Sequence, residues 1–222
     1  MQADVEIQTL VIPNSFILGR KELDLLNLLV FSSLQIILTG AFIREINMKV
    51  LAFAASNSSR SINKKLVTYA TRFLSNAEVE LLDLNDYEMP LFSVDREDEI
   101  GEHEVAKRFL AKIAEADGIM VSFAEHNSSY TVAYKNVFDW SSRITGQVYQ
   151  NKPMVLFSTS NGRRGGMGVL GHAAAGIPFQ GGIVKGTLSV PSFKDNFNQE
   201  TGEITDPELQ KQIQAVVASL FA

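Results

Sequence analysis

The sequence contains no cysteine, and this absence excludes disulfide bonds, thiol nucleophiles and cysteine-ligated metal clusters. A chain without thiols suits a reducing compartment, and we expect a cytoplasmic protein. Its three histidines, His103, His126 and His172, are far apart, and no two have the spacing of metal ligands on one helix or loop. The composition therefore predicts no metal site.

Positive charge is also scarce, because 20 Lys and Arg residues stand against 25 Asp and Glu residues and give a formal net charge of −5. The basic residues form no stripe with interleaved aromatic residues, so we expect no nucleic-acid partner. Hydrophobic residues make up 45% of the 222 residues, which is enough for the core of one domain, alone or with an appendage.

Residues 1–47 differ from the rest of the chain. The segment 25–43 reads LLNLLVFSSLQIILTGAFI and has roughly the length of a membrane-spanning helix, but polar residues interrupt it and the flanking charges are balanced. Three interpretations are open: a start codon assigned too far upstream, with Met48 as the working start; a weak hydrophobic anchor; and a cleaved signal peptide. We therefore expect an extension of unclear role over 1–47, no membrane association except through 23–43, and one domain over 48–222.

Beyond Lys49, short apolar runs alternate with segments of helical periodicity. Strands are predicted at 50–55, 79–84, 119–123, 154–157 and 183–190, and helices at 61–73, 105–117, 130–143, 168–177 and 206–220. The run 50–55 is continuously apolar, as in a strand that is buried on both faces. This alternation predicts an α/β fold, an open five-stranded parallel sheet with helices on both faces. Ligands of such sheets bind beyond the carboxyl ends of the strands.

Local signals predict where several helices begin and end. Ser61 has the position of an N-cap, and Asp206-Pro207-Glu208 combines a capping oxygen, a fixed φ and an acid in the first turn. Asp117-Gly118 predicts the end of the helix at 105–117, because glycine is favoured just after a helix. The segment around Met89-Pro90-Leu91 and the acidic residues after it is predicted to be a loop.

The first loop at the carboxyl edge, residues 56–63, has the chemistry of a phosphate site. It joins a buried strand to a helix N-terminus, whose free N–H groups and partial positive charge favour anions. The residues that we expect to bind phosphate are Ser56, Ser58, Arg60, Ser61, Ile62 and Asn63. Lys64 and Lys65 follow in the first turn, where cations oppose the helix dipole unless a dianion is bound. The alternative is an ordinary serine-rich turn with a capped helix and solvated lysines.

Residues 55–63, read with the next two loops, resemble the NADPH-dependent FMN reductase family of flavodoxin-like proteins. Members typically show Gly-Ser-x-Arg-x-x-Ser-x-Asn after the first strand; Ser56, Ser61 and Asn63 match that pattern, whereas Ala55 replaces the glycine and Ser58 the arginine. Arg60, two positions on, supplies a charge in this interpretation. The resemblance implies a flavodoxin-like three-layer fold with strand order 2-1-3-4-5.

The second loop strengthens the resemblance. The family has Pro-Glu-Tyr-Asn after the third strand and then Leu-Lys-Asn-x-x-Asp-Trp, and this chain has Ala124-Glu125-His126-Asn127-Ser128 and then Tyr134-Lys135-Asn136-Val137-Phe138-Asp139-Trp140. The resemblance implies that Glu125, His126, Asn127 and Ser128 lie along the flavin ring and ribityl chain. His126 as an ordinary exposed loop histidine is an equal alternative, and for Trp140 we expect packing in the core or at a subunit interface.

The third loop, 158–166, is rich in glycine and small residues, which allow a backbone to approach a flat ring closely. In the family a similar loop reaches the pyrimidine edge of the flavin, which implies that Ser160, Asn161, Gly162, Arg163 and Gly165 bind FMN. Arg163 or Arg164 would add positive charge there or meet the phosphates of NADPH. The alternative is a surface loop with two solvated arginines.

The resemblance implies an NAD(P)H-dependent FMN reductase. Electrons would pass from NADPH or NADH through flavin N5 to a small acceptor such as a quinone, an azo compound, free flavin or an oxidised metal species, with no side chain required as a catalytic acid or base. It also implies a homodimer or homotetramer, with Tyr130, Tyr134, Val137 and Phe138 at the subunit contact. Two alternatives remain: a flavodoxin-like electron carrier or redox sensor without its own turnover, and a non-flavin hydrolase or dehydrogenase, for which neither a nucleophile elbow nor a dinucleotide fingerprint is present.

Overall fold

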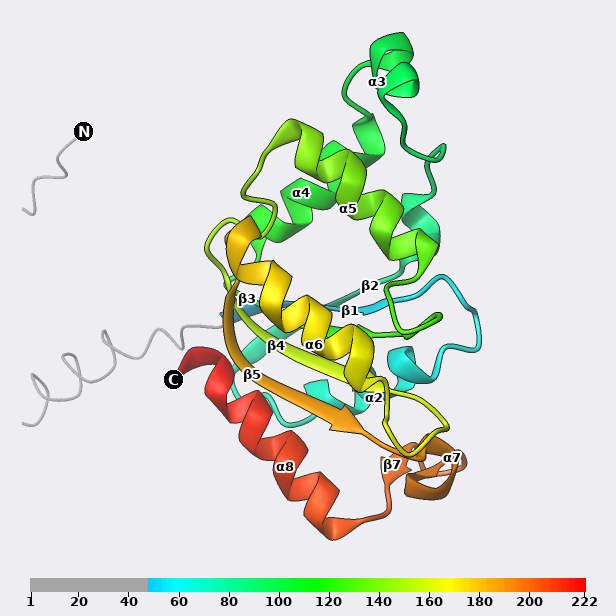
Figure 1. Cartoon of the computed structure of the whole chain (residues 1–222). Coiled ribbons are helices and arrows are strands. Elements are labelled where there is room, and N and C mark those ends of the chain that lie inside the picture. The colour runs from blue at the N-terminus through cyan, green and yellow to red at the C-terminus, as the bar shows by residue number, and fades with distance from the viewer. Residues whose placement is uncertain (1–47) are drawn as a thin grey trace, which may run out of the picture. The chain divides into compact units, whose positions relative to one another are not determined.

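Five parallel strands form the centre of the structure, a computed structural model that describes residues 48–222. The strands are β1 (Met48–Ala55), β2 (Ala77–Leu82), β3 (Gly118–Phe123), β4 (Pro153–Thr159) and β5 (Ile183–Val190). Their order is β2-β1-β3-β4-β5, and every neighbouring pair is parallel (Figure 1). The predicted flavodoxin-like sheet is confirmed, whereas the expectations for residues 1–47 lie outside the described residues.

Helices cover both faces of the sheet. One face packs against α4 (Glu104–Glu115), α5 (Val132–Ile144) and α6 (Met167–Gly176), and the other against α2 (Ile62–Thr71) and α8 (Pro207–Ala218). Side chains alternate along β1, so that Leu51 and Phe53 enter the first core and Val50 and Ala52 the second. Burial on both faces explains why this strand reads as an unbroken apolar run.

The predicted helix starts at Ser61 and Asp206 are confirmed. The Ser61 hydroxyl accepts a hydrogen bond from Lys64 N, and the Asp206 carboxylate accepts bonds from Glu208 N and Leu209 N. Each side chain satisfies amides that have no acceptor within the helix.

The predicted helix end at Asp117-Gly118 is wrong. Helix α4 ends at Glu115, Gly118 begins β3, and the Asp117 carboxylate accepts a hydrogen bond from Lys49 N at 2.8 Å. Gly118 packs closely, because a Cβ there would lie 2.8 Å from the Phe221 ring and would displace it. The dipeptide has the composition of a helix end, but long-range contacts determine its structure.

The segment between β2 and α4 contains helices that the sequence did not predict. A 3₁₀ turn, η1 (Leu84–Tyr87), is followed by α3 (Val94–Ile100). Helix α3 has no buried residue, so it lacks the apolar periodicity that would predict it. Its N-terminus is fixed locally, because the Ser93 hydroxyl accepts a hydrogen bond from Arg96 N at 3.1 Å.

Smaller elements complete the second half of the chain: η2 (Ile177–Gln180), α7 (Phe193–Asn196), a hairpin of β6 (Phe197–Asn198) with β7 (Glu203–Ile204), and η3 (Ser219–Phe221). Within residues 48–222, no helix combines the length and the hydropathy that a membrane crossing requires.

Candidate functional site

The three loops expected to form the site meet at the carboxyl edge of the sheet, and Asn63 joins them. Its side chain is 2% exposed. The Asn63 Oδ1 atom accepts hydrogen bonds from Ser122 Oγ of β3 at 2.7 Å and from Thr159 N of β4 at 3.0 Å, and Nδ2 donates to Thr159 O at 3.1 Å. The start of α2 is thereby tied to the ends of the two neighbouring strands. Both the oxygen and the nitrogen of the Asn63 amide group are engaged in these bonds, so its side chain positions the first loop.

The first loop turns tightly in front of α2. Ser56 Oγ accepts a hydrogen bond from Ser58 N at 3.2 Å, and Ser58 Oγ accepts one from Arg60 N at 3.3 Å. The N–H groups of Ile62 and Asn63 belong to the first turn of α2, where amides have no intrahelical acceptor. This end of the helix is therefore suited to an anion.

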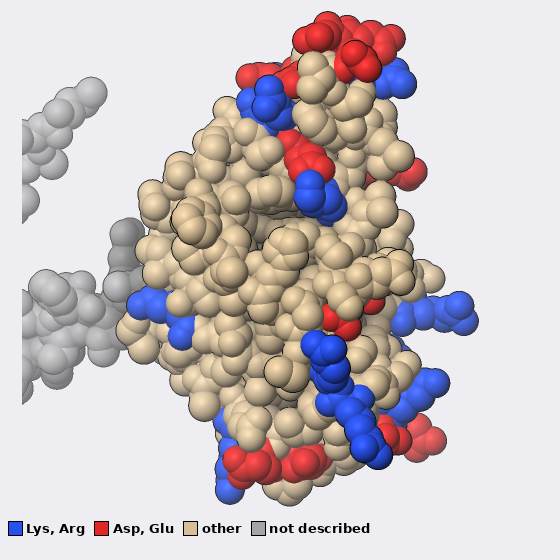
Figure 2. Space-filling view, in the orientation of Figure 1, with Lys and Arg blue, Asp and Glu red and all other residues tan. Residues whose placement is uncertain are grey.

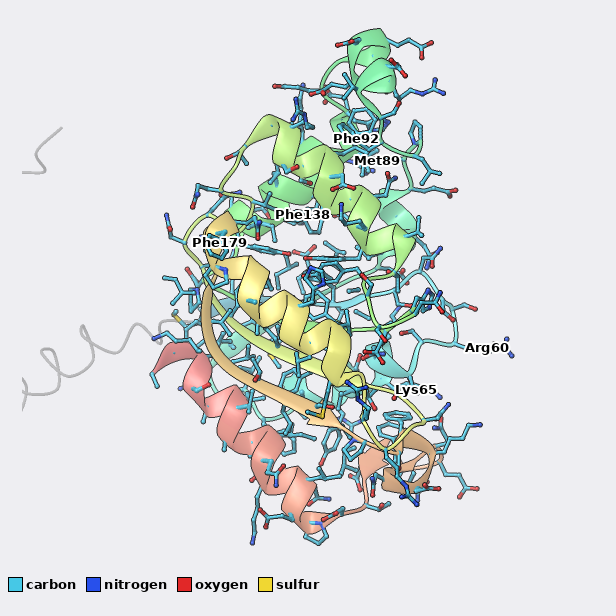
Figure 3. The ribbon with its side chains drawn as sticks, in the orientation of Figure 1. Arg60, Lys65, Met89, Phe92, Phe138 and Phe179 are labelled. Carbon is cyan, nitrogen blue, oxygen red and sulfur yellow. The ribbon has the colours of Figure 1, made fainter. Side chains whose placement is uncertain are left out.

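The basic side chains near this loop either extend into solvent or bond to other residues of the chain. Arg60 is exposed, and Figure 3 shows its side chain extending away from the sheet. Lys64 Nζ bonds Asp83 Oδ2 at 2.5 Å, and Lys65 Nζ bonds the side-chain oxygen of Gln199. The Lys64 bond holds the pKa of Asp83 below its usual value. The expected conflict of these lysines with the helix dipole is relieved in part by partners within the chain.

The second loop contains a tight turn with two left-handed residues. His126 and Ser129 exchange backbone hydrogen bonds of 3.0 Å, and the central residues Asn127 and Ser128 have φ values of 52° and 64°. Asparagine tolerates this conformation, whereas it costs a serine about 1 kcal/mol or more. All four residues are exposed, so the turn presents its side chains at the surface of the site.

Glu125 connects the second loop to the third. Its Oε1 atom accepts a hydrogen bond from Val169 N at 3.0 Å, in the first turn of α6, where a carboxylate also interacts favourably with the helix dipole. A Cβ on Gly168 would lie 2.6 Å from the same oxygen, so glycine makes room for this contact. The structure therefore gives Glu125 a positioning role, and its contact with a flavin stays a prediction.

The glycines of the third loop differ in how closely their backbone is packed. Gly165 has a φ of 55°, and a Cβ on it would lie 2.5 Å from Ser189 Oγ and 2.7 Å from the Val190 backbone. Gly162 has a negative φ and would meet only Ser160 Oγ, at 3.7 Å. Gly165 is thus explained by close packing on the end of β5. Asn161, Gly162 and Arg163 are exposed and stay free to approach a ligand.

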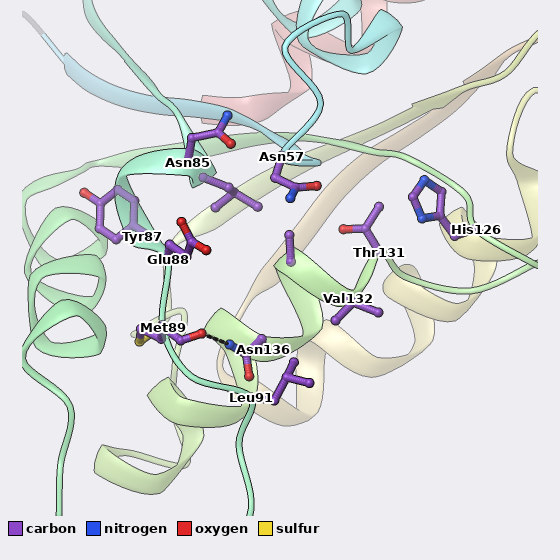
Figure 4. A pocket seen from close by; sticks show the side chains of 12 residues that line it. Asn57, Asn85, Tyr87, Glu88, Met89, Leu91, His126, Thr131, Val132 and Asn136 are labelled. Atoms are coloured by element: carbon purple, nitrogen blue, oxygen red, sulfur yellow. Dashed lines mark hydrogen bonds between the residues drawn. The ribbon is translucent and has the colours of Figure 1, made fainter. Parts of the chain in front are cut away.

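Sequence reasoning missed a segment that belongs to the site. Residues 84–91 line a cleft of about 270 Å³ together with Asn57 of the first loop and His126 of the second (Figure 4). Asn136 Nδ2 donates to Met89 O at 3.1 Å, and Trp140 Nε1 donates to Pro90 O at 2.8 Å. These two members of the Lys-Asn-x-x-Asp-Trp pattern therefore hold the wall of the cleft. The sequence signal for this role was the presence of two hydrogen-bond donors four residues apart, on one face of a predicted helix.

The outcome for the aromatic residues of α5 is mixed. Trp140 is 1% exposed, which confirms the prediction that it packs in the core. Tyr134 and Val137 are each 2% exposed within their own chain, so the expectation that they form a subunit contact is wrong. The hydroxyl groups of Tyr134 and Tyr149 bond each other inside this core, and burial raises the pKa of the neighbouring Tyr130 to about 12.

The comparisons with known proteins agree with this arrangement. The model of the family described as NADPH-dependent FMN reductase matches residues 48–195. The chain belongs to this family. The match includes all three loops and the pattern that holds the cleft wall.

Similar proteins include an NAD(P)H-dependent FMN reductase of Pseudomonas aeruginosa, 26% identical over 177 residues, which are 78% of this chain and 94% of that protein. A 2-hydroxy-1,4-benzoquinone reductase of a Burkholderia species is 33% identical over 120 residues, 53% of this chain. A quinone reductase of Escherichia coli K12 is 27% identical over 124 residues, 54% of this chain. The matches span 63% and 64% of the length of the last two proteins.

Solved structures share the fold. A flavoenzyme NAD(P)H:(acceptor) oxidoreductase from Paracoccus denitrificans has a TM-score of 0.62 at 23% identity and covers 78% of this chain and 94% of its own. An oxidoreductase from Corynebacterium diphtheriae has a TM-score of 0.59 at 17% identity and covers 78% and 95%. Among residues 48–222, no group of three or more His, Asp or Glu side chains is placed to hold a metal ion.

Proposed function

We propose that the protein is an FMN-dependent NAD(P)H oxidoreductase that passes electrons from NADPH or NADH to a small acceptor: a quinone, an azo compound, free flavin or an oxidised metal species. The observation that carries this proposal is the meeting of the three loops at one edge of the sheet, through Asn63 and Glu125. The exposed turn at 126–129 and the α2 N-terminus lie at that edge and fit a flat ring with a phosphate tail.

Each loop has a part in this proposal. The first loop holds the FMN phosphate through Ser58, Ser61 and the amides of Ile62 and Asn63, the second lies along the ring, and the third donates hydrogen bonds to the pyrimidine edge. FMN, when bound, supplies hydride chemistry at N5. The chain's own residues bind and orient it, and none is assigned a proton-transfer role. An electron carrier without its own turnover is not favoured, because the similar proteins are named as reductases.

We also propose that the protein is a cytoplasmic homodimer or homotetramer. The face over α5 and α6 carries few charged side chains, whereas acidic residues gather over α3 (Figure 2). Large apolar side chains are exposed at this face: Phe179 is 81%, Val132 66% and Met167 57% exposed. Such residues are typical of a surface that another subunit covers.

The proposal is tested with purified full-length protein. Titration with FMN should produce a bound-flavin spectrum, and NADPH or NADH should then be oxidised in the presence of a quinone. Absence of nucleotide oxidation with every acceptor class would reject the reductase.

The phosphate site has a sharper test. Ser58→Asp places a carboxylate beside the FMN phosphate, and like charges side by side should weaken FMN binding about tenfold or more while riboflavin, which has no phosphate, binds as before. Ser93→Asp adds the same charge at the N-cap of α3, where Asp caps as well as Ser, and should change neither affinity. Equal weakening of FMN and riboflavin by Ser58→Asp would place the phosphate elsewhere.

A further inference from the structure

The cleft beside the first two loops has one acidic residue and no Lys or Arg in its lining. Among its twelve lining residues, the acidic one is Glu88 (Figure 4). Glu88 is exposed, and within residues 48–222 it makes no ion pair. No basic side chain of residues 48–222 therefore lies within ion-pairing distance of this carboxylate. Arg60, Arg163 and Arg164 do not line this cleft.

Hydrogen bonds between separate elements hold the walls of the cleft. Asn136 bonds both sides of the 89–92 segment, donating to Met89 O at 3.1 Å and accepting from Phe92 N at 2.9 Å. Thr131 Oγ1 donates to Ala55 O at 2.9 Å and ties the start of α5 to the end of β1. A ligand therefore meets a preformed shape, and less ordering is needed on binding.

The lining chemistry suits a flat molecule without negative charge. Met89, Leu91 and Val132 offer apolar surface, and the amides of Asn57 and Asn85 offer donors for carbonyl oxygens. A phosphate or sulfonate would meet the Glu88 carboxylate with no Lys or Arg in the lining to compensate. The phosphates of a nicotinamide nucleotide fit better beside Arg163 and Arg164 of the third loop.

We propose that this cleft binds the electron acceptor and that Glu88 makes the protein select uncharged or cationic planar acceptors over anionic ones. The inference rests on the proposed reductase function and adds to it the charge class of the substrate. Glu88 acts as a specificity-determining residue, through Coulomb repulsion of acceptors that carry an acid group.

The kinetic test compares a quinone pair that differs by one charge: 2-methyl-1,4-naphthoquinone and 1,4-naphthoquinone-2-sulfonate. Glu88→Gln should raise the ratio of kcat/KM for the sulfonate to kcat/KM for the neutral quinone about threefold, and Glu88→Lys about tenfold, because interactions between exposed charges are of this size. Glu99→Gln on α3 makes the same change in net charge outside the lining and should leave the ratio unaltered.

Two further readouts separate a charge effect from a structural one. Added salt should raise kcat/KM for the sulfonate in the native protein and have little effect in Glu88→Gln, since screening removes the repulsion. Calorimetric titration of the flavin-loaded protein with each quinone, without an electron donor, should show the same change in selectivity as the kinetics.

The outcomes distinguish this inference from the function on which it rests. A protein that oxidises NADPH or NADH but has the same sulfonate-to-neutral ratio in the native, Glu88→Gln and Glu88→Lys forms would overturn the assignment of the cleft and leave the reductase standing. A protein that binds no flavin and oxidises no nucleotide would reject the reductase itself.

Discussion

Single residues decide how the carboxyl edge of the sheet is built. Asn63, Glu125 and Gly165 were each expected to touch the cofactor, and the structure gives each a role in holding the loops together. Residues that position loops and residues that contact a ligand occur in the same short motifs, so a motif alone does not separate them. Substitutions that change one of these roles at a time can separate them.

Gly165 and Gly162 form a matched pair for this purpose. Gly165→Ala forces a left-handed alanine against the β5 backbone and should lower the free energy of unfolding by about 2 kcal/mol or more. Gly162→Ala has open space and a negative φ, and should change it by less than about 1 kcal/mol. Denaturant unfolding of both variants measures the difference, and equal stability would contradict the packing role of Gly165.

At the scale of elements, the sequence predicted what local chemistry determines. All five strands, their parallel arrangement and the starts of α2 and α8 follow from apolar runs and capping residues near in sequence. The predicted end of α4 was wrong because Gly118 belongs to β3, where it packs against Phe221, a residue distant in sequence. Helix α3 and the wall at 84–91 were missed because one has no buried face and the other is held by Asn136 and Trp140 of another element.

Helix α2 and the 3₁₀ turn η1 are joined by Lys64 and Asp83, and this link should depend on pH. The Lys64 bond lowers the pKa of Asp83, so the contribution to stability is present at neutral pH and is lost as pH falls through that lowered pKa. Both side chains are partly exposed, at 45% and 33%, so we expect a coupling of only about 0.5 kcal/mol.

A double-mutant cycle of Lys64→Met and Asp83→Asn measures this coupling without the opposing effect of Lys64 on the helix dipole. The coupling free energy should be favourable at pH 7 and disappear in acid below the lowered pKa of Asp83, where the carboxyl group is protonated. A coupling that is the same at both pH values would show that the two elements are joined by packing.

At the scale of the whole molecule, the face over α5 and α6, which carries few charged side chains, bears on assembly. Phe179 is the most exposed large apolar side chain among the described residues. If this face joins subunits, Phe179→Glu should weaken association by about tenfold or more, because a carboxylate would be buried at an apolar contact. Light scattering of the protein as it elutes from a sizing column measures the mass. Gln214→Glu, at an exposed position of α8 on the other face of the sheet, is a control that adds one negative charge as Phe179→Glu does. An unchanged mass would place the subunit contact elsewhere.

Helix α8 and Leu220 complete the core on one face of the sheet, which bears on the synthesis of the protein. Leu220 is fully buried in the core between α2, α8 and the sheet, and the Phe221 ring covers the first residue of the central strand β3. A ribosome makes α8 and Leu220 after all five strands, so the core on this face, which α2 covers in part, stays incomplete until they emerge. Until then the nascent chain exposes an apolar surface to the cell's chaperones, whereas the carboxyl edge is joined through Asn63, Ser122 and Thr159, which are all made earlier.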